Sequence, residues 1–250
     1  MKKNKILITG AAGFIGSHLT EYFVKKNFHV AAFDRYNTNN QFGWLDNSQI
    51  RNKLELILGD IRDYDSVYKS MRNCSGVIHL AALIGIPYSF VSPLAYVKTN
   101  IEGTYNVLEA AKNLKIKNLI VTSTSETYGS AQYMPIDEKH PINSQSPYAA
   151  SKAAADQLAL SFHKSFNLPV KIIRPFNTYG PRQSSRAIIP TIINQCLNKN
   201  NKNIFLGNVK PTRDFTYVED LCDAYYKIYK NNKVVGQIIN VGTNTKISMN

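Results

Sequence analysis

Two residues, Tyr148 and Lys152, have the types and the spacing that acid–base chemistry requires. Residues four apart lie on one face of a helix, so the ammonium group would lie beside the phenol. A neighbouring positive charge favours the phenolate and lowers the phenol pKa from about 10. The pair is therefore predicted to take a proton from an alcohol while a hydride leaves the same carbon atom. A lone Tyr-x-x-x-Lys pattern is common, so its weight depends on the rest of the chain.

The segment TSTSE (122–126) follows an apolar run that is typical of a strand. Ligands of parallel sheets bind at the carboxyl ends of the strands, so Thr124 and Ser125 could hold a substrate oxygen near Tyr148. The same residue types also favour an ordinary turn. Glu126 is more informative, because a carboxylate here can abstract a carbon-bound proton once a ketone has formed beside it.

A glycine-rich segment, GAAGFIG (10–16), links the first apolar run to the first helical pattern. Glycines permit a tight turn and the close approach of a pyrophosphate, and the helix N-terminus adds partial positive charge. This context predicts a dinucleotide-binding loop. Asp34, at the end of the second strand, could accept hydrogen bonds from the adenosine ribose and would repel a 2′-phosphate. NAD is therefore favoured over NADP, although Arg35 next to it could pair with that phosphate.

Short apolar runs alternate with helical patterns at 14–26, 100–114 and 148–166, as in right-handed βαβ units. Asp60, after the third run, could accept from the adenine amino group, or could simply cap a helix. Small residues at the end of the fourth run, Ala81 and Ala82, would let a cofactor lie close to the backbone. The predicted strands are Lys5–Thr9, His29–Asp34, Leu54–Leu58, Gly76–Ala82, Asn118–Ser123, Val170–Arg174 and Gln237–Val241.

The composition is that of a globular protein, with 250 residues, 44% hydrophobic and 19% charged. The net charge of +13 comes from scattered lysines, and no nucleic-acid-binding motif is present, so we expect no nucleic-acid partner. Three widely separated cysteines without a CxxC pair predict no metal site. Without a signal peptide or a run of about 18 apolar residues, a cytoplasmic protein that does not bind membranes is expected.

The predicted fold is α/β, a Rossmann-type doubly wound parallel sheet with a small C-terminal substrate-binding lobe. Residues 1–175 would form the NAD-binding domain, and 204–241 would return to it. Proline and glycine recur after residue 175, which assigns 176–203 and 242–250 to the lobe. The chain ends soon after the last strand-like run, so the lobe is expected to be truncated.

Seven segments in this order resemble the extended short-chain dehydrogenase/reductases, the NAD-dependent epimerase/dehydratase family. The segments are GAAGFIGSHL, GDIRD, HLAAL, TSTSETYG, SPYAASK, RPFNTYGPRQ and PTRDFTYVED. The stretches QFGWLD, SPYAASKAAADQLALSF and RPFNTYGPRQSSRAIIPTII are most similar to the sugar-nucleotide 4,6-dehydratases that include GDP-N-acetylglucosamine 4,6-dehydratase of the legionaminic acid pathway. The resemblance further implies a homodimer formed through two helices per subunit, acting in cell-surface polysaccharide biosynthesis.

The resemblance also implies a role for each matching residue. Thr124 would hold O4 of the sugar, Tyr148 would be the base for the 4-hydroxyl, and Lys152 its partner on the nicotinamide ribose. Glu126 would abstract the C5 proton, beside Ser125 where many dehydratases have Asp. The cofactor would contact Gly10, Gly13, Phe14, Ile15, Gly16, Asp34, Arg35, Asp60, Ile61, Leu80, Ala81, Ala82, Asn100, Thr122, Tyr148, Lys152 and Pro175. The nucleotide diphosphate sugar, GDP- or UDP-linked, would contact Thr124, Asn177, Ile188, Ile189, Pro190 and Arg213.

The reaction implied by this resemblance begins with oxidation at C4, continues with loss of water across C5 and C6, and ends with hydride return to C6. A 4-epimerase needs no carboxylate at position 126, and such enzymes usually have a small or apolar residue there, so Glu126 argues against it. Thr-Ser-Glu does not separate dehydration from the decarboxylation of UDP-glucuronate. A non-catalytic NAD-binding regulator is disfavoured by the intact Tyr148 and Lys152 pair.

Overall fold

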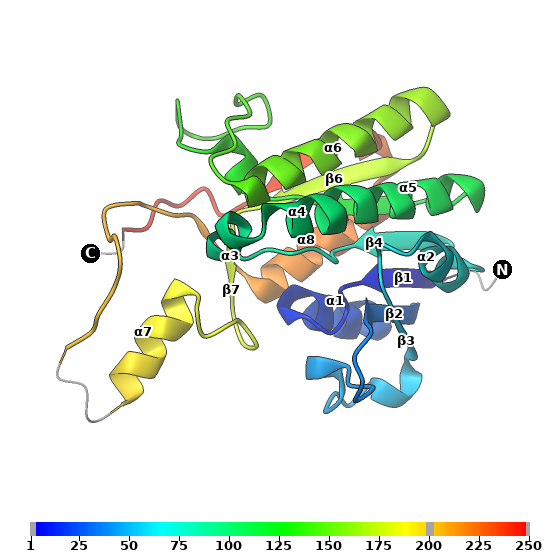
Figure 1. The fold of residues 1–250 in the computed structure, drawn as a ribbon, viewed down its shortest axis with the longest axis horizontal. Helices are drawn as coiled ribbons and strands as arrows, with labels where there is room; N and C mark the ends of the chain where they lie inside the picture. The colour runs from blue at the N-terminus through cyan, green and yellow to red at the C-terminus, as the bar shows by residue number, and fades with distance from the viewer. Residues whose placement is uncertain (1–3, 199–202, 249–250) are drawn as a thin grey trace.

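A seven-stranded parallel sheet forms the centre of the computed structural model, which describes residues 4–198 and 203–248 (Figure 1). The strand order is β3-β2-β1-β4-β5-β6-β9, so the direction of winding reverses between β1 and β4. This confirms the predicted Rossmann-type α/β fold. The strands are β1 (Lys5–Thr9), β2 (His29–Arg35), β3 (Glu55–Gly59), β4 (Gly76–His79), β5 (Leu119–Thr122), β6 (Val170–Pro175) and β9 (Ile238–Val241).

Helices cover both faces of this sheet and bury its apolar runs in two hydrophobic clusters (Figure 1). One face packs against α1 (Phe14–Lys25) and α8 (Val218–Lys230), and the other against α2 (Tyr64–Met71), α5 (Gly103–Asn113) and α6 (Pro147–Phe166). The middle residues of β1, Ile6–Ile8, are fully buried, as a strand covered on both sides requires. Shorter segments are η1 (Gly43–Leu45), η2 (Arg51–Lys53), α3 (Ile86–Val91), α4 (Pro93–Tyr96), η4 (Ser125–Tyr128) and η5 (Asn232–Val234).

Helix α6 starts at the carboxyl edge of the sheet because its first turn is fixed locally. The Ser146 side chain caps the helix by accepting from the Ala149 amide at 3.1 Å, and Pro147 occupies the first turn. Tyr148 therefore lies in the first turn of α6, and Lys152 one turn further along. The helix ends at Asn167, whose left-handed conformation breaks the pattern.

The single helix predicted over 100–114 is wrong for its first three residues. Residues Val97–Glu102 form a π-helical segment, η3, and the α-helix α5 begins only at Gly103. The hydroxyl of Thr104 donates to the Asn100 carbonyl at 2.6 Å, and the Asn100 side chain bonds the backbone of Leu83. These bonds compete with the regular ladder and hold the widened turn where the loop after β4 returns.

After β6 the chain leaves the main sheet, forms a separate two-stranded sheet, and then returns to the main sheet with α8 and β9. Strand β7 (Asn177–Tyr179) pairs in parallel with β8 (Phe215–Tyr217), and α8 and β9 then pack on the sheet. Between β7 and β8, α7 (Ile188–Leu197) projects away from the body of the molecule (Figure 1). All residues of α7 are described, and none of them is buried. Residues 199–202 and 249–250 of the predicted lobe lie outside the described residues. None of the helices in the described ranges has the length and apolar character that crossing a membrane requires.

Candidate active site

The glycine loop turns tightly between β1 and α1, and two of its glycines are required by the chain itself. Gly10 has a φ of +71°, and a Cβ atom there would lie 2.9 Å from the Ala81 amide nitrogen. A Cβ at Gly16 would lie 2.0 Å from the Gly10 carbonyl oxygen. Gly13 differs, because it is exposed and an added Cβ would meet only that oxygen, at 3.4 Å, among the described atoms. The open side of Gly13 is a cradle that a ligand can fill.

This cradle fits a pyrophosphate. Helix α1 begins after Gly13 with no side-chain cap, so its first amides, at Phe14 and Ile15, have no intrahelical partner in the described chain. Such amides and the helix dipole attract anions. The Asp34 carboxylate accepts from the Ala12 amide at 2.6 Å and from the Arg35 amide at 2.7 Å. Each of its oxygens keeps a lone pair for a ribose hydroxyl, while burial raises the pKa of Asp34 against these two hydrogen bonds.

A buried chain of hydrogen bonds positions the end of β4 beside the glycine loop. Thr104 donates to a carbonyl, so His79 Nε2–H donates to the Thr104 oxygen at 3.1 Å, and His79 Nδ1 accepts from Thr9 at 2.7 Å. The Thr9 oxygen then accepts from the Leu80 and Ala81 amides, each at 3.2 Å. Burial, with a smaller effect of Lys152, lowers the pKa of His79 to about 3. The histidine is therefore a neutral structural link.

Three predicted cofactor residues already have partners within the chain. Asp60 forms an ion pair with Arg62, which lowers its pKa, and Ile61 is buried against Gly103. Asn100 is 1% exposed and bonds Leu83 and Ser151 through its side-chain amide. Asn100 thus fixes the loop after β4. Of the remaining cofactor residues, Pro175 is the buried last residue of β6, whereas Arg35 is exposed.

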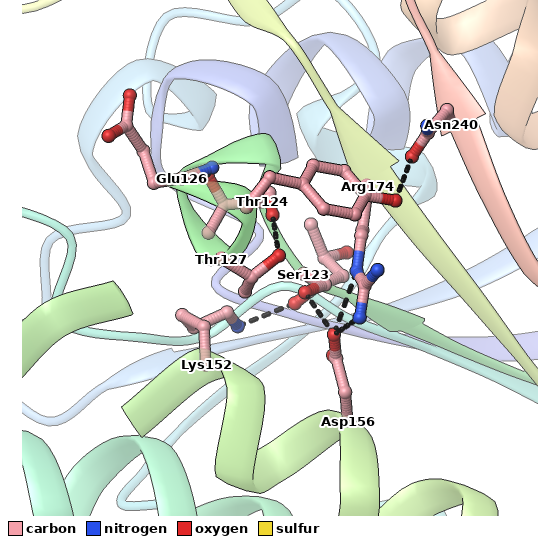
Figure 2. A network of polar contacts seen from close by, with 10 residues as sticks. Ser123, Thr124, Glu126, Thr127, Lys152, Asp156, Arg174 and Asn240 are labelled. Atoms are coloured by element: carbon pink, nitrogen blue, oxygen red, sulfur yellow. Dashed lines mark hydrogen bonds and ion pairs between the residues drawn. The ribbon is translucent and has the colours of Figure 1, made fainter. Parts of the chain in front are cut away.

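Tyr148, Lys152 and Thr124 meet where β5 ends and α6 begins. Tyr148 is 8% exposed, and its hydroxyl is hydrogen-bonded by Thr124. Lys152 is 4% exposed and donates to the backbone carbonyl of Thr122 (Figure 2). The predicted lowering of the Tyr148 pKa is wrong for this structure: burial raises it to about 12, although the Thr124 hydrogen bond acts in the opposite direction. Burial also lowers the pKa of Lys152 to about 8.

Glu126 and Ser125 occupy the short 3-10 turn that follows β5. Thr124 caps this turn by accepting from the Glu126 amide at 3.2 Å. The Glu126 carboxylate points away from the buried polar residues below it (Figure 2). It has no hydrogen bond or ion pair with the described residues. Its charge contributes to the raised pKa of Tyr148, so the two groups lie close enough to interact. An unpaired carboxylate beside a phenol and a hydroxyl suits a carbon-acid base.

A charged network that the sequence reasoning missed lies directly beneath this turn. The Asp156 Oδ2 atom accepts from Ser123 at 2.7 Å and from two Arg174 nitrogens at 3.0 and 2.9 Å (Figure 2). The Arg174 guanidinium lies over the Tyr128 ring, 4.8 Å from its centroid. Asp156 follows Lys152 by four residues, and this spacing was the available signal. The partner on β6 has no such local signal.

The predicted substrate residues lie beyond β6. Asn177 begins β7, and its amide donates to Asp214 at 3.1 Å, so Arg213 lies on the neighbouring segment. Arg213 is exposed, whereas Ile188, Ile189 and Pro190 are half-buried in the first turn of α7. Arg186, just before α7, interacts electrostatically with Tyr96, whose ring lies 6.3 Å from that of Tyr148. Arg186, two residues before α7, therefore lies near enough to Tyr96 for its charge to act on that phenol.

The parallel sheet, its glycine cradle and the Tyr148–Lys152 pair at the same edge define an extended short-chain dehydrogenase/reductase. The chain belongs to the family described as GDP-mannose 4,6 dehydratase, whose model matches residues 7–250.

The chain is similar to proteins from several organisms. A dTDP-D-glucose 4,6-dehydratase of Dictyostelium discoideum is 37% identical over 98% of the chain and 59% of its own length. A putative UDP-glucose 4-epimerase of Methanocaldococcus jannaschii is 34% identical over 98% of the chain and 79% of its own length. The crystal structure of a DesIV double mutant, a dTDP-glucose 4,6-dehydratase from Streptomyces venezuelae with NAD bound, superposes with a TM-score of 0.87. It is 27% identical, and the match covers 98% of the chain and 77% of that structure. The chain therefore spans little more than half of the Dictyostelium protein.

Proposed function

We propose that the chain is an NAD-dependent hydro-lyase, a sugar-nucleotide 4,6-dehydratase that forms a 4-keto-6-deoxy sugar from a GDP- or UDP-linked substrate. One observation carries this proposal: the unpaired carboxylate of Glu126 lies on the same strand-end turn as Thr124, which bonds Tyr148. Oxidation and return of a hydride require only the tyrosine, the threonine and a nicotinamide. The additional carboxylate is what elimination across C5 and C6 requires.

NAD would be held by the first amides of α1, by Asp34 and by Lys152. The cradle at Gly13 and the helix N-terminus suit its pyrophosphate, and the carboxylate of Asp34 suits ribose hydroxyls better than a 2′-phosphate. When bound, NAD⁺ supplies a positive charge near the phenol and accepts the C4 hydride that later returns to C6. Lys152 uses one N–H on Thr122 and has others to direct at a ribose.

The residues of the chain would then handle two protons. Tyr148 takes the proton of the 4-hydroxyl while Thr124 holds the same oxygen, and Glu126 takes the C5 proton and passes it to the C6 hydroxyl, which leaves as water. C5 regains a proton from solvent as Tyr148 releases its own, so the net change is the loss of one water molecule. Ser125, beside Glu126 on the turn, would hydrogen-bond the departing C6 hydroxyl. Since burial keeps Tyr148 protonated in the cofactor-free chain, its conversion to a base depends on positive charge in the loaded site.

Mass spectrometry of the products distinguishes the possible reactions. The chain is incubated with NAD and a panel of GDP-, UDP- and dTDP-linked sugars and uronic acids. Dehydration removes about 18 mass units and decarboxylation about 44, whereas epimerisation leaves the mass unchanged. We expect loss of water, and we expect Glu126→Gln to reduce it by about 10²–10⁴-fold, the usual contribution of a general base. Unchanged dehydration by that variant would contradict the role given to Glu126.

A 4-epimerase is the second candidate, favoured by the similarity to the archaeal protein named above. It would use Thr124, Tyr148 and Lys152 but would leave Glu126 idle. Interconversion of two sugars of equal mass, with no effect of Glu126→Gln, would establish it. This is the less economical explanation of the site, because it gives no role to a carboxylate that has no hydrogen bond or ion pair with the described residues.

The same proposal includes the organisation of the protein. Residues 1–175 with 204–241 would bind the cofactor, and 176–203 with 242–250 would bind the sugar nucleotide. A homodimer is supported by the exposed apolar side chains on α3, α4 and α5, namely Tyr88, Phe90, Val91, Leu94 and Tyr105. Sedimentation of the protein as a monomer at micromolar concentration would contradict the dimer.

A further inference from the structure

Three charged side chains are buried together beneath the site, and their charges do not cancel. Lys152 and Arg174 are cations, and Asp156 is the one carboxylate among the described residues that is fully buried. Arg174 is committed to Asp156 through two hydrogen bonds. No direct ion pair joins Lys152 to Asp156 among the described side chains, but the two interact through space. The cluster therefore contains one uncompensated positive charge next to Tyr148.

The geometry around Asp156 is one-sided. Oδ2 accepts all three hydrogen bonds, from Ser123 and Arg174, while Oδ1 is buried and has no partner among the described atoms. A buried carboxylate without full satisfaction is costly unless its charge is useful. Because Asp156 follows Lys152 by one helical turn, its negative charge acts on the ammonium group within the same dry surroundings.

We propose, resting on the proposed function, that Asp156 is a positioning residue whose charge keeps Lys152 an ammonium ion at the site, and that Arg174 sets how strongly it does so. Lys152 is required as a cation, because its positive charge favours the phenolate of Tyr148 and an ammonium has two further N–H groups, besides the one used on Thr122, to donate to a ribose. Asp156 does not touch the reacting atoms. It acts through Lys152, and the positive charge of Arg174 offsets part of the negative charge of Asp156.

Among the groups around Lys152, Asp156 has the main influence on the protonation of the lysine. On β4, His79 is neutral, as its lowered pKa requires. On α6 itself, Tyr148 is an uncharged phenol. On α8, Tyr225 is also uncharged, because burial raises the pKa of its phenol, and it is hydrogen-bonded to Thr122. Glu126 acts on Tyr148 from the turn above. Burial lowers the pKa of Lys152, and Asp156 is the group that raises it.

The test measures the protonation of Lys152 directly and without substrate. The full chain is labelled with ¹³C at the lysine ε-carbon, and the Lys152 signal is assigned by its loss in Lys152→Met. Its titration midpoint is then compared in Asp156→Asn and Arg174→Gln. We expect the midpoint to fall by about one pH unit or more in the first variant and to rise in the second. Asp223→Asn, which removes an exposed carboxylate on α8, is the matched control and should change nothing.

Opposite shifts are the decisive result, because a merely structural role would move both variants in the same direction through loosened packing. Shifts in the same direction, or none, would overturn the proposal. If Arg174→Gln does not fold, an unchanged or raised midpoint in Asp156→Asn overturns it, and if Asp156→Asn does not fold, an unchanged or lowered midpoint in Arg174→Gln does so. In active enzyme, the alkaline limb of the pH–rate profile should follow the midpoint of Lys152. If the midpoints separate but no sugar nucleotide is converted, the charge role of Asp156 stands and the proposed reaction fails.

Discussion

The two halves of the sheet's carboxyl edge build their sites in opposite ways. The glycine-loop side, formed by β1, α1 and β2, uses backbone amides and the absence of side chains around Gly13. The tyrosine–lysine side, formed by β5, α6 and β6, packs charged side chains into the interior, with Lys152, Asp156 and Arg174 almost inaccessible. The first side can accept a ligand with little rearrangement. The second has its electrostatics set by long-range packing before any ligand arrives.

This difference determines what each side tolerates. On the glycine-loop side, a substitution acts through steric volume, because the functional groups belong to the backbone. On the tyrosine–lysine side, it acts through charge and hydrogen bonding in a dry environment, where small chemical changes have large effects. Four variants can break or sharpen this contrast.

The largest effect is expected from Tyr148→Phe. Removal of the phenol hydroxyl deletes the group that exchanges a proton with the substrate, so turnover should fall by about 10²–10⁴-fold. The glycine-loop side is untouched, so the dissociation constant of NAD, measured by calorimetry, should stay within about threefold. Near-normal turnover by this variant would show that the tyrosine–lysine side is not the reacting centre.

A pair of alanine substitutions tests the glycine-loop side. Gly16→Ala places a Cβ atom 2.0 Å from the Gly10 oxygen, so it should lower the free energy of unfolding by about 1–3 kcal/mol or more. Gly13→Ala meets the same atom at 3.4 Å and should change that free energy by less than about 1 kcal/mol.

For NAD binding, Gly13→Ala should be the variant with the clear defect. Gly13→Ala fills the cradle, so its NAD dissociation constant should rise about tenfold, equivalent to about 1.4 kcal/mol. Thermal unfolding gives the stability and calorimetry the affinity. Tight NAD binding by a folded Gly13→Ala protein would mean that the pyrophosphate lies elsewhere.

The smallest effect at neutral pH concerns His79, which lies on β4 between the two sides. Its folded pKa of about 3 lies below the usual 6.5, so the unfolded chain takes up a proton first as the pH falls. Stability is therefore lost between pH 6.5 and 3, by about 2 kcal/mol at pH 5. The free energy of unfolding of His79→Gln should be less sensitive to pH in this window. His29→Gln, at an exposed position, should keep the wild-type slope.

The sequence predicted the features that depend on short-range patterns. The apolar runs give all seven strands of the main sheet to within a few residues, and the glycine spacing gives the loop before α1. Strand β4 stops earlier than expected because the Leu80 and Ala81 amides bond the Thr9 side chain. Helix α8 was missed, although its buried residues recur at helical spacing.

The features that could not be predicted depend on packing between distant segments. Arg174 lies within an apolar strand, and nothing near it in the chain indicates that Asp156 is its partner. The raised pKa of Tyr148 has the same origin, because burial is decided by the elements that close over the phenol. Spacing brought Tyr148 and Lys152 together correctly, but it carried no information about the surrounding dielectric.

The pairing of β7 with β8 has a consequence for how the segment around α7 is attached. Because the pair is parallel, the chain leaves at Tyr179 and re-enters at Phe215, which is the register partner of Asn177. Just beyond β7, the Arg182 guanidinium forms an ion pair with Glu21 on α1 and donates to the Ser17 hydroxyl. The segment is therefore fastened to the helix that follows the glycine loop as well as to β8. A segment transplanted from a relative would keep this second attachment only with a cation at position 182.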